Sequence, residues 1–289
     1  MKTIKRTLFF GIFCSSLLLV RCDENGNFIL FSLQNDIELG AQVAEQIASD
    51  PDQFPILPRT STNAQAYAYL DNMVASILDA QDDAGNDAVT YRTEFAWEVQ
   101  IIKDDNVLNA FATPGGYIYI YTGLIKFLDR ADDLAGVIGH EIAHADQRHS
   151  SKQLQRQYGV SLLLSIALGE EPSELAELVS TIAGTLGSLS FSRNLESEAD
   201  EFSVIYLADT DYACNGAFSF FQKLIDQQQT GNTPKFLSTH PDPASRVDAI
   251  NDKATALGCS TDAAFDNEDD LQRKEYLFFK CDYLPDGCD

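Results

Sequence analysis

The sequence predicts a mainly α-helical fold with one small antiparallel β-sheet, an α+β domain. Three observations support this. Several segments repeat apolar residues at helical spacing, one run near residue 120 is rich in aromatic and β-branched residues, and a long apolar helical pattern follows that run. With 289 residues, 45% of them apolar, the chain can bury one sizeable core. We expect a signal peptide (1–21), a tether (22–34), one domain (35–260) and an acidic, disulfide-containing tail (261–289).

The first 21 residues have the pattern of an export signal. Lys2, Lys5 and Arg6 form a basic start, and the apolar run 8–20 that follows is too short to span a membrane comfortably. Cys22 comes next, after a segment similar to the lipid-attachment box of bacterial lipoproteins, except that Arg21 stands where a small residue is usual. We expect lipidation of Cys22, ahead of ordinary secretion with cleavage nearby. Either way the protein is expected to be exported, to the bacterial periplasm or outer membrane.

The chain is strongly acidic, with 44 Asp+Glu against 20 Lys+Arg. Four of the bases lie in residues 1–21, so the exported protein would keep 16 bases against the same 44 acids. Such a charge argues against nucleic acid and anionic membrane surfaces as partners. We expect plain solubility to be its main consequence.

Four cysteines remain after Cys14 and Cys22, and an even count in an exported chain suggests two disulfides. Three pairings exist. We favour Cys281–Cys288 as a local loop and Cys214–Cys259 as a longer tie. The rival interpretation, a cysteine zinc site, lacks any C-x-x-C spacing.

The first half of the domain predicts two helices and three strands. Helical periodicity covers residues 36–48 and 64–80, with prolines between them and an acidic loop at 81–87. Strand patterns follow at 97–102, 107–112 and 117–121, with a turn at 114–116. We expect these strands to form the antiparallel sheet, and a short helix at 123–128 to follow it.

The next helix carries the pattern H-E-x-x-H at residues 140–144. His140 and His144 are four apart, so both imidazoles lie on one face and can share one Zn²⁺. Glu141 can reach a water on that metal as a general base. Asp132 and Asp133 fall in the expected first turn. The chain has only four histidines, and we place His149 in this same helix, which argues against coincidence.

Two apolar stretches, 160–168 and 175–189, are each shorter than a membrane span. We interpret them as a helical hairpin that covers the site, with a membrane-dipping or substrate-gating element as the alternative. A further helix opens at Ser192 and continues to about Leu207.

A catalytic zinc needs a third protein ligand. Glu196 and Glu198 are both candidates. Glu196 and Asp200 are four apart and share a helix face, whereas Glu198 points about half a turn away. A ligand carboxylate beside a second carboxylate that orients a ligand histidine favours Glu196 as ligand and Asp200 as the partner of His140. A solvated acidic helix start is the plain alternative.

Five segments together resemble the zinc metalloendopeptidase family of the CAAX prenyl protease, HtpX, the mitochondrial Oma-type proteases and the periplasmic proteins BepA and LoiP. They occur in the family's order, and the resemblance covers roughly residues 36–258. The five segments are 109–116, 139–144, 149–150, 196–200, and 238–243 with Arg246. The chain looks more like the soluble periplasmic branch, without the tetratricopeptide extension of BepA. The resemblance implies a zincin-like metalloprotease domain.

The resemblance also implies roles. His140, His144 and Glu196 would bind one Zn²⁺ per chain, and Glu141 would be the general base. His240 and Arg246 would lie over the cleft, where either could stabilise the oxyanion, and His240 could instead hold the enzyme latent by occupying the metal's open position. His149 would hold its surroundings in place. The strand Asn109, Ala110, Phe111, Ala112 and Thr113 would pair with the substrate backbone.

The expected function is therefore zinc-dependent hydrolysis of peptide bonds in misfolded or envelope proteins, with a role in cell-envelope protein quality control. A chaperone-like factor that binds outer-membrane or unfolded proteins and rarely cuts is the alternative, although pure binding would not need Glu141. A structural zinc domain is a weaker third interpretation.

Overall fold

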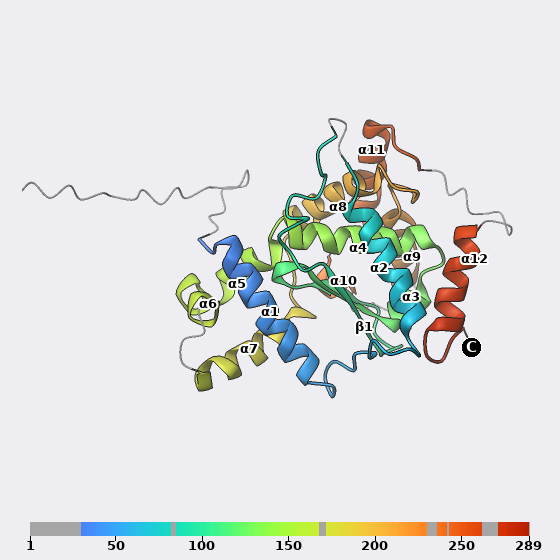
Figure 1. Ribbon diagram of the computed structural model, residues 1–289. Helices are drawn as coiled ribbons and strands as arrows, with labels where there is room; N and C mark the ends of the chain where they lie inside the picture. Colours follow the sequence, from blue (N-terminus) through green and yellow to red (C-terminus); the bar gives the residue numbers. More distant parts are fainter. Residues whose placement is uncertain are drawn as a thin grey trace, which may run out of the picture.

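The computed structural model describes residues 30–81, 85–167, 172–229, 236–241, 243–261 and 271–288. The predicted signal peptide and Cys22 lie outside these residues. The described chain is mostly helical and is built around one three-stranded sheet, as predicted (Figure 1). No helix in it combines the length and the apolar character that crossing a membrane requires.

The sheet consists of β1 (Glu98–Ile102), β2 (Ala110–Ala112) and β3 (Tyr117–Tyr121) in the order β1-β3-β2. The prediction that it is wholly antiparallel is wrong, because β1 pairs with β3 in parallel and only β2 pairs with β3 antiparallel. The chain reverses twice between β1 and β3, so β3 returns in the direction of β1 and lies between the other two strands. This order leaves β2 at one edge of the sheet.

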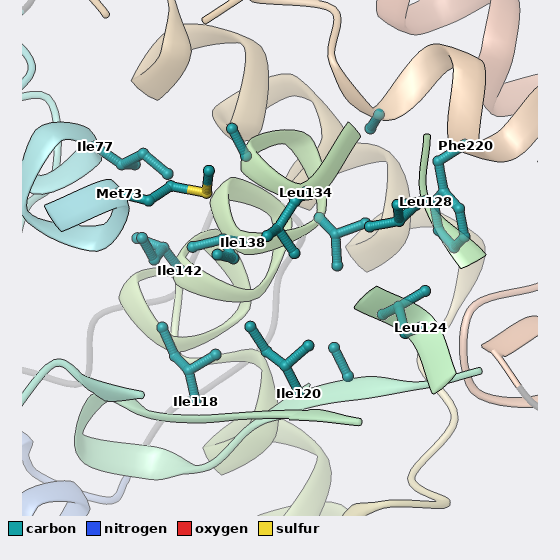
Figure 2. Close-up of a cluster of buried hydrophobic side chains, with 14 of the residues drawn as sticks. Met73, Ile77, Ile118, Ile120, Leu124, Leu128, Leu134, Ile138, Ile142 and Phe220 are labelled. Atoms are coloured by element: carbon teal, nitrogen blue, oxygen red, sulfur yellow. The ribbon is translucent and has the colours of Figure 1, made fainter. Parts of the chain in front are cut away.

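Helix α4 (Ala131–Asp146) forms the centre of the domain, and all of its residues are buried. Its apolar side chains pack against the sheet and against α2 (Ala64–Leu78), as Figure 2 shows for Ile138 and Ile142 beside Ile118, Ile120 and Met73. On other sides it packs against α8 (Arg193–Leu207) and α9 (Ala217–Gln229). Gly136 permits the close approach of α9, since a Cβ there would lie 2.1 Å from the Ala217 nitrogen.

Helix α1 (Leu33–Ser49) begins at the N-cap Ser32, whose hydroxyl accepts a hydrogen bond from the Asn35 amide. The helix therefore begins three residues before the predicted start at residue 36. The apolar face of α1 packs against α6 (Val160–Ala167) and α7 (Pro172–Leu186). These two helices form the predicted pair, although Leu168 lies outside the described residues. They pack mainly on α1, and they share a buried cluster with Phe191, which follows α7 and stacks on His144.

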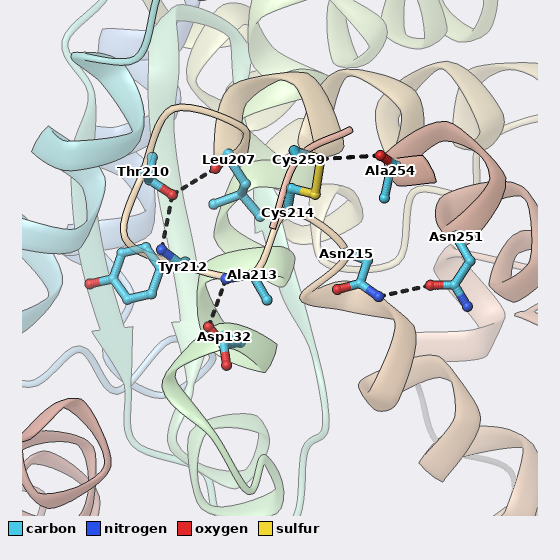
Figure 3. The surroundings of a disulfide bond; sticks show 10 residues. All are labelled: Asp132, Leu207, Thr210, Tyr212, Ala213, Cys214, Asn215, Asn251, Ala254 and Cys259. Carbon is cyan, nitrogen blue, oxygen red and sulfur yellow. Dashed lines mark hydrogen bonds between the residues drawn. A yellow bond between two sulfur atoms is a disulfide. The ribbon is translucent and has the colours of Figure 1, made fainter. Parts of the chain in front are cut away.

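The C-terminal residues pack onto the domain. Tyr276 of α12 (Leu271–Phe278) and Phe279 of the π-helical turn η3 (Phe279–Tyr283) are buried in the main core. The Tyr276 hydroxyl donates to the Ile125 carbonyl, in the short helix α3 (Thr122–Phe127). Two disulfides are present, Cys281–Cys288 and Cys214–Cys259. The second joins the chain before α9 to the chain after α11 (Pro243–Leu257), as Figure 3 shows.

Candidate metal centre

Four buried side chains from three separate parts of the chain meet at one point: His140 and His144 of α4, Glu196 of α8 and His240. Each offers a donor atom, and these atoms lie within 4.8 Å of one another. The Nε2 atoms of His140 and His144 are 3.0 Å apart. Glu196 lies 3.5 Å from both of these nitrogens. His240 follows α10 (Phe236–Thr239) and places its Nδ1 3.1 Å from Glu196 Oε1.

Asp200 contacts His140 at Nδ1, the ring nitrogen that faces away from the cluster, and Arg246 in turn binds Asp200. Asp200 lies one helical turn after Glu196, and its Oδ1 is 2.9 Å from His140 Nδ1. The Arg246 guanidinium grips the same carboxylate through Nε and Nη2, each at 2.6 Å, and its Nη1 lies 2.8 Å from Glu196 Oε2. Phe221 supports the guanidinium, whose carbon lies 4.1 Å from the ring centroid. Arg246 is thus hydrogen-bonded to Asp200 through two nitrogens, whereas its Nη1 lies close to Glu196 without a hydrogen-bond partner among the described residues.

His149 contacts His144 from the next helix, not from α4. Helix α4 ends at Asp146, Arg148 adopts a left-handed conformation with φ 58°, and α5 (His149–Tyr158) begins at His149. The prediction that His149 shares the helix of His140 is therefore wrong. Its Nδ1 lies 3.0 Å from His144 Nδ1, and its Nε2 lies 3.2 Å from Glu198 Oε2. Glu198 faces away from the cluster, as its helical position predicts, but it is the partner of His149.

Glu141 is buried beside the cluster with one oxygen free of hydrogen bonds. Its Oε1 has no hydrogen-bond partner among the described residues and lies 3.6 Å from His240 Nε2. Burial raises the pKa of the Glu141 carboxyl, although His240 and His140 oppose the shift. A buried, unsatisfied carboxylate with a raised pKa is costly to the fold and is typical of a functional acid or base.

Opposite pKa shifts distinguish the two histidines of α4. Burial would lower the pKa of His140, but hydrogen bonds to Asp200 and Glu196 raise it to about 9. For His144, burial and the neighbouring His140 lower the pKa. Burial raises the pKa of Glu196, but His240 and Arg246 outweigh it and hold the pKa well below its usual range. The cluster therefore contains an ionised carboxylate beside two histidines whose pKa values shift in opposite directions.

Aromatic rings pack on two of the histidines, which the sequence analysis missed. The Phe191 ring stacks on His144 at 4.1 Å between centroids, and the Phe236 ring stacks on His240 at 4.3 Å. The Phe191 amide also donates to the Thr239 carbonyl, so the segment after α7 is tied to the segment that carries His240. As a result the cluster is enclosed, and none of its four members is more than 1% exposed.

The predicted substrate strand lies next to the cluster at the open edge of the sheet. Residues 109, 111 and 113 form the ladder with β3, so the peptide groups of Ala110 and Ala112 face the other way. Ser150 donates to the outward Ala112 carbonyl. Asn109 is tied sideways, because its side chain donates to the Gly187 carbonyl and accepts from Thr239. The segment therefore links the sheet edge to both segments that enclose the cluster.

The donor set fits a divalent metal ion. A carboxylate can only accept, so Asp200 keeps a proton on Nδ1 of His140, and Nε2 can bind a metal once its own proton is displaced. Two imidazole nitrogens and a carboxylate at one point match the ligand set that zinc prefers, and partners such as Asp200 commonly orient metal-binding histidines. His240 could supply a fourth donor.

The profile of Peptidase family M48 matches residues 71–254, which include the whole cluster. The chain is 30% identical over 167 residues to the beta-barrel assembly-enhancing protease of Escherichia coli, covering 54% of this chain and 34% of that protein. It is 29% identical over 167 residues to the mitochondrial metalloendopeptidase OMA1 of Schizosaccharomyces pombe, covering 57% of this chain and 49% of that one. The chain thus spans between a third and a half of the length of these relatives.

Proposed function

Because this chain belongs to peptidase family M48, we propose that it is a zinc-dependent metalloendopeptidase that hydrolyses peptide bonds in misfolded or envelope proteins. The observation that carries the proposal is the convergence of His140, His144 and Glu196 beside the free oxygen of Glu141. The names of the relatives, a beta-barrel assembly-enhancing protease and a metalloendopeptidase, agree with it. An exported, envelope location follows from the lipoprotein-like start and remains part of the proposal.

His140, His144 and Glu196 would hold the zinc ion, which when bound polarises the scissile carbonyl and lowers the pKa of a water toward about 7. Glu141 takes the proton of the attacking water, because its Oε1 is free, and then passes it to the leaving amine. Asp200 keeps His140 in its binding orientation.

The oxyanion partner is more consistent with His240 than with Arg246. Nε and Nη2 of the Arg246 guanidinium both donate to Asp200, and Nη1, which has no hydrogen-bond partner among the described residues, lies 2.8 Å from Glu196 Oε2. His240 Nε2 instead lies next to the free oxygen of Glu141, where the reacting groups would meet. We assign Arg246 to positioning Asp200 and Glu196.

Substrate binding is assigned to β2. Its outward peptide groups lie at Ala110 and Ala112, and an extended peptide would add there as a further strand by replacing the hydrogen bond from Ser150 to the Ala112 carbonyl. This mode binds the substrate mainly through its backbone and depends less on its side chains, which suits a protease for unfolded polypeptides.

A latent resting state is the second part of the proposal. His240 Nδ1 lies 3.3 Å from His140 Nε2, inside the donor cluster, so this imidazole can fill the position that a substrate or water needs. The closed packing of Phe191 and Phe236 around the cluster agrees with a site that opens only when these segments move.

The deciding experiment compares residues 23–289 with the Glu141→Gln variant, both with measured zinc content, on casein and on an unfolded outer-membrane protein. We expect equal zinc content and a loss of cleavage of roughly 10²–10⁴-fold in the variant. Cleavage by Glu141→Gln at the wild-type rate would refute the assignment. Zinc-loaded protein that prevents aggregation of the unfolded substrate without cutting it would favour the chaperone-like alternative.

A further inference from the structure

A series of hydrogen bonds outside the metal cluster links Glu198 to His149, and His149 to His144. It runs from Glu198 Oε2 to His149 Nε2 at 3.2 Å, and from His149 Nδ1 to His144 Nδ1 at 3.0 Å. Both histidines are fully buried, and the Glu198 side chain is 26% exposed. No part of the proposed reaction uses His149 or Glu198, so their alignment requires its own explanation.

The order of donors and acceptors along this series of hydrogen bonds determines which nitrogen of each histidine carries the proton. The Glu198 carboxylate can only accept, so Nε2 of His149 is the donor. A neutral imidazole carries one N–H, which leaves Nδ1 of His149 as an acceptor. The facing Nδ1 of His144 must then carry the proton, and His144 Nε2 is left as a bare lone pair that points at the cluster.

We propose that Glu198 and His149 are positioning residues that lock His144 into the tautomer and orientation that bind the metal. The inference rests on the proposed zinc function of the cluster. It gives His144 a carboxylate–histidine support that parallels the direct support of His140 by Asp200.

The break between α4 and α5 is what makes this contact. On one continuous helix, a residue five positions after His144 would point about 140° away from it. The left-handed Arg148 interrupts the helix and turns His149 back toward His144.

Contacts with helix α1 and the residues just before it stabilise the left-handed conformation of Arg148 between α4 and α5. Arg148 Nε lies 2.5 Å from a buried oxygen of Asp36, and Arg148 Nη2 donates to the Phe31 carbonyl. Asp36 and Phe31 lie outside the stretch 71–254 that the family profile matches. The N-terminal helix of this chain thus contributes to the geometry of the metal site.

The first test measures zinc affinity by competition with a chromophoric chelator. His149→Leu removes the acceptor for His144, and we expect the zinc affinity to fall by roughly 10–100-fold. His149→Asn keeps an acceptor oxygen near the position of Nδ1 and should bind zinc more tightly than His149→Leu. Unchanged affinity in His149→Leu, or equal losses in Leu and Asn, would overturn the proposal.

Glu198→Gln tests the end of the hydrogen-bond series that lies farthest from the metal cluster, and it does so without removing a buried ring. Its matched control is Glu201→Gln, which removes the same charge from α8 at a side chain that is 55% exposed and paired with Lys253. We expect weaker zinc binding in Glu198→Gln and wild-type binding in Glu201→Gln. Equal effects of the two variants would contradict a specific role for Glu198.

The second readout is the tautomer itself, from ¹⁵N spectra of histidine-labelled, zinc-loaded protein without a histidine tag. The chain has four histidines, so the spectrum is simple. We expect His149 as the Nε2–H form and His144 with its proton on Nδ1. An Nδ1–H form of His149 would refute the proposal even if the enzyme cleaves normally. A wild type that binds no zinc would instead refute the proposed function.

Discussion

Arg246 and Asp200 form a buried, two-point ion pair, in which Nε and Nη2 of the arginine each lie 2.6 Å from a different carboxylate oxygen. The same carboxylate receives His140 Nδ1 at 2.9 Å. Burial raises the pKa of Asp200, but the arginine and His140 outweigh it, and the pKa is lowered below its usual range. The pair therefore keeps the carboxylate ionised behind a proposed metal ligand.

We expect Arg246→Met to destabilise the protein by about 3–5 kcal/mol, because it leaves the Asp200 charge buried without its partner. Arg246→Lys keeps the charge but cannot reproduce two parallel bonds, so it should also lose stability. Urea unfolding measures both. The control is Arg59→Met, which breaks a two-point pair with Asp71 whose side chains are 37% and 47% exposed, and should cost less than about 1 kcal/mol. A similar loss in both methionine variants would show that burial is unimportant.

Removal of the metal should abolish cleavage. The three proposed ligands are buried, so we expect slow loss of activity on dialysis against a strong chelator, and recovery when zinc is restored. Metal content and casein cleavage are followed together. Full activity in protein shown to contain no metal would exclude the proposed mechanism.

His240→Ala should increase basal proteolysis, because Nδ1 of His240 lies inside the donor cluster and we expect release of this latch to outweigh the loss of the oxyanion contact. Initial rates on unfolded substrate, at equal zinc content, provide the measurement. A decrease would indicate that His240 serves the transition state and does not act as a latch.

Gly40→Ala should destabilise the chain by about 1–3 kcal/mol, because a Cβ on this α1 residue would lie 2.0 Å from the Pro114 carbonyl oxygen. The displaced turn η1 (Pro114–Gly116) follows the proposed substrate strand, so KM should also rise. Gly184→Ala in α7 is the matched control. Its new Cβ would meet only the end of the Gln53 side chain, at 3.3 Å, and alanine is the better helix former, so stability should stay level or increase. Equal effects would exclude steric contact as the cause.

The two disulfides should contribute unequally to stability. Cys214–Cys259 closes a loop with a sequence separation of 45, and Cys281–Cys288 one of 7. The chain-entropy estimate gives losses of about 4 and about 2 kcal/mol when each pair is replaced by serine. Urea unfolding of the two double variants tests this order, and a reversed order would show that native packing outweighs loop closure.

The sequence was sufficient for features that depend on local chain geometry. Helical spacing alone placed His140 with His144, and Glu196 with Asp200, on shared faces. The strand pattern located β3, and the spacing of motifs indicated the family that the profile match shows. In each case the positions of the side chains follow from a few neighbouring residues.

Only the tertiary structure determined the features that depend on distant segments. The parallel pairing of β1 with β3, the packing of α6 and α7 on α1, and the contact of Phe191 with His144 all join segments that local spacing does not relate. His149 appeared to belong to the helix of His140, because nothing in the local pattern marks Arg148 as left-handed. That conformation is held by Asp36, 112 residues earlier, and only the folded chain brings the two together.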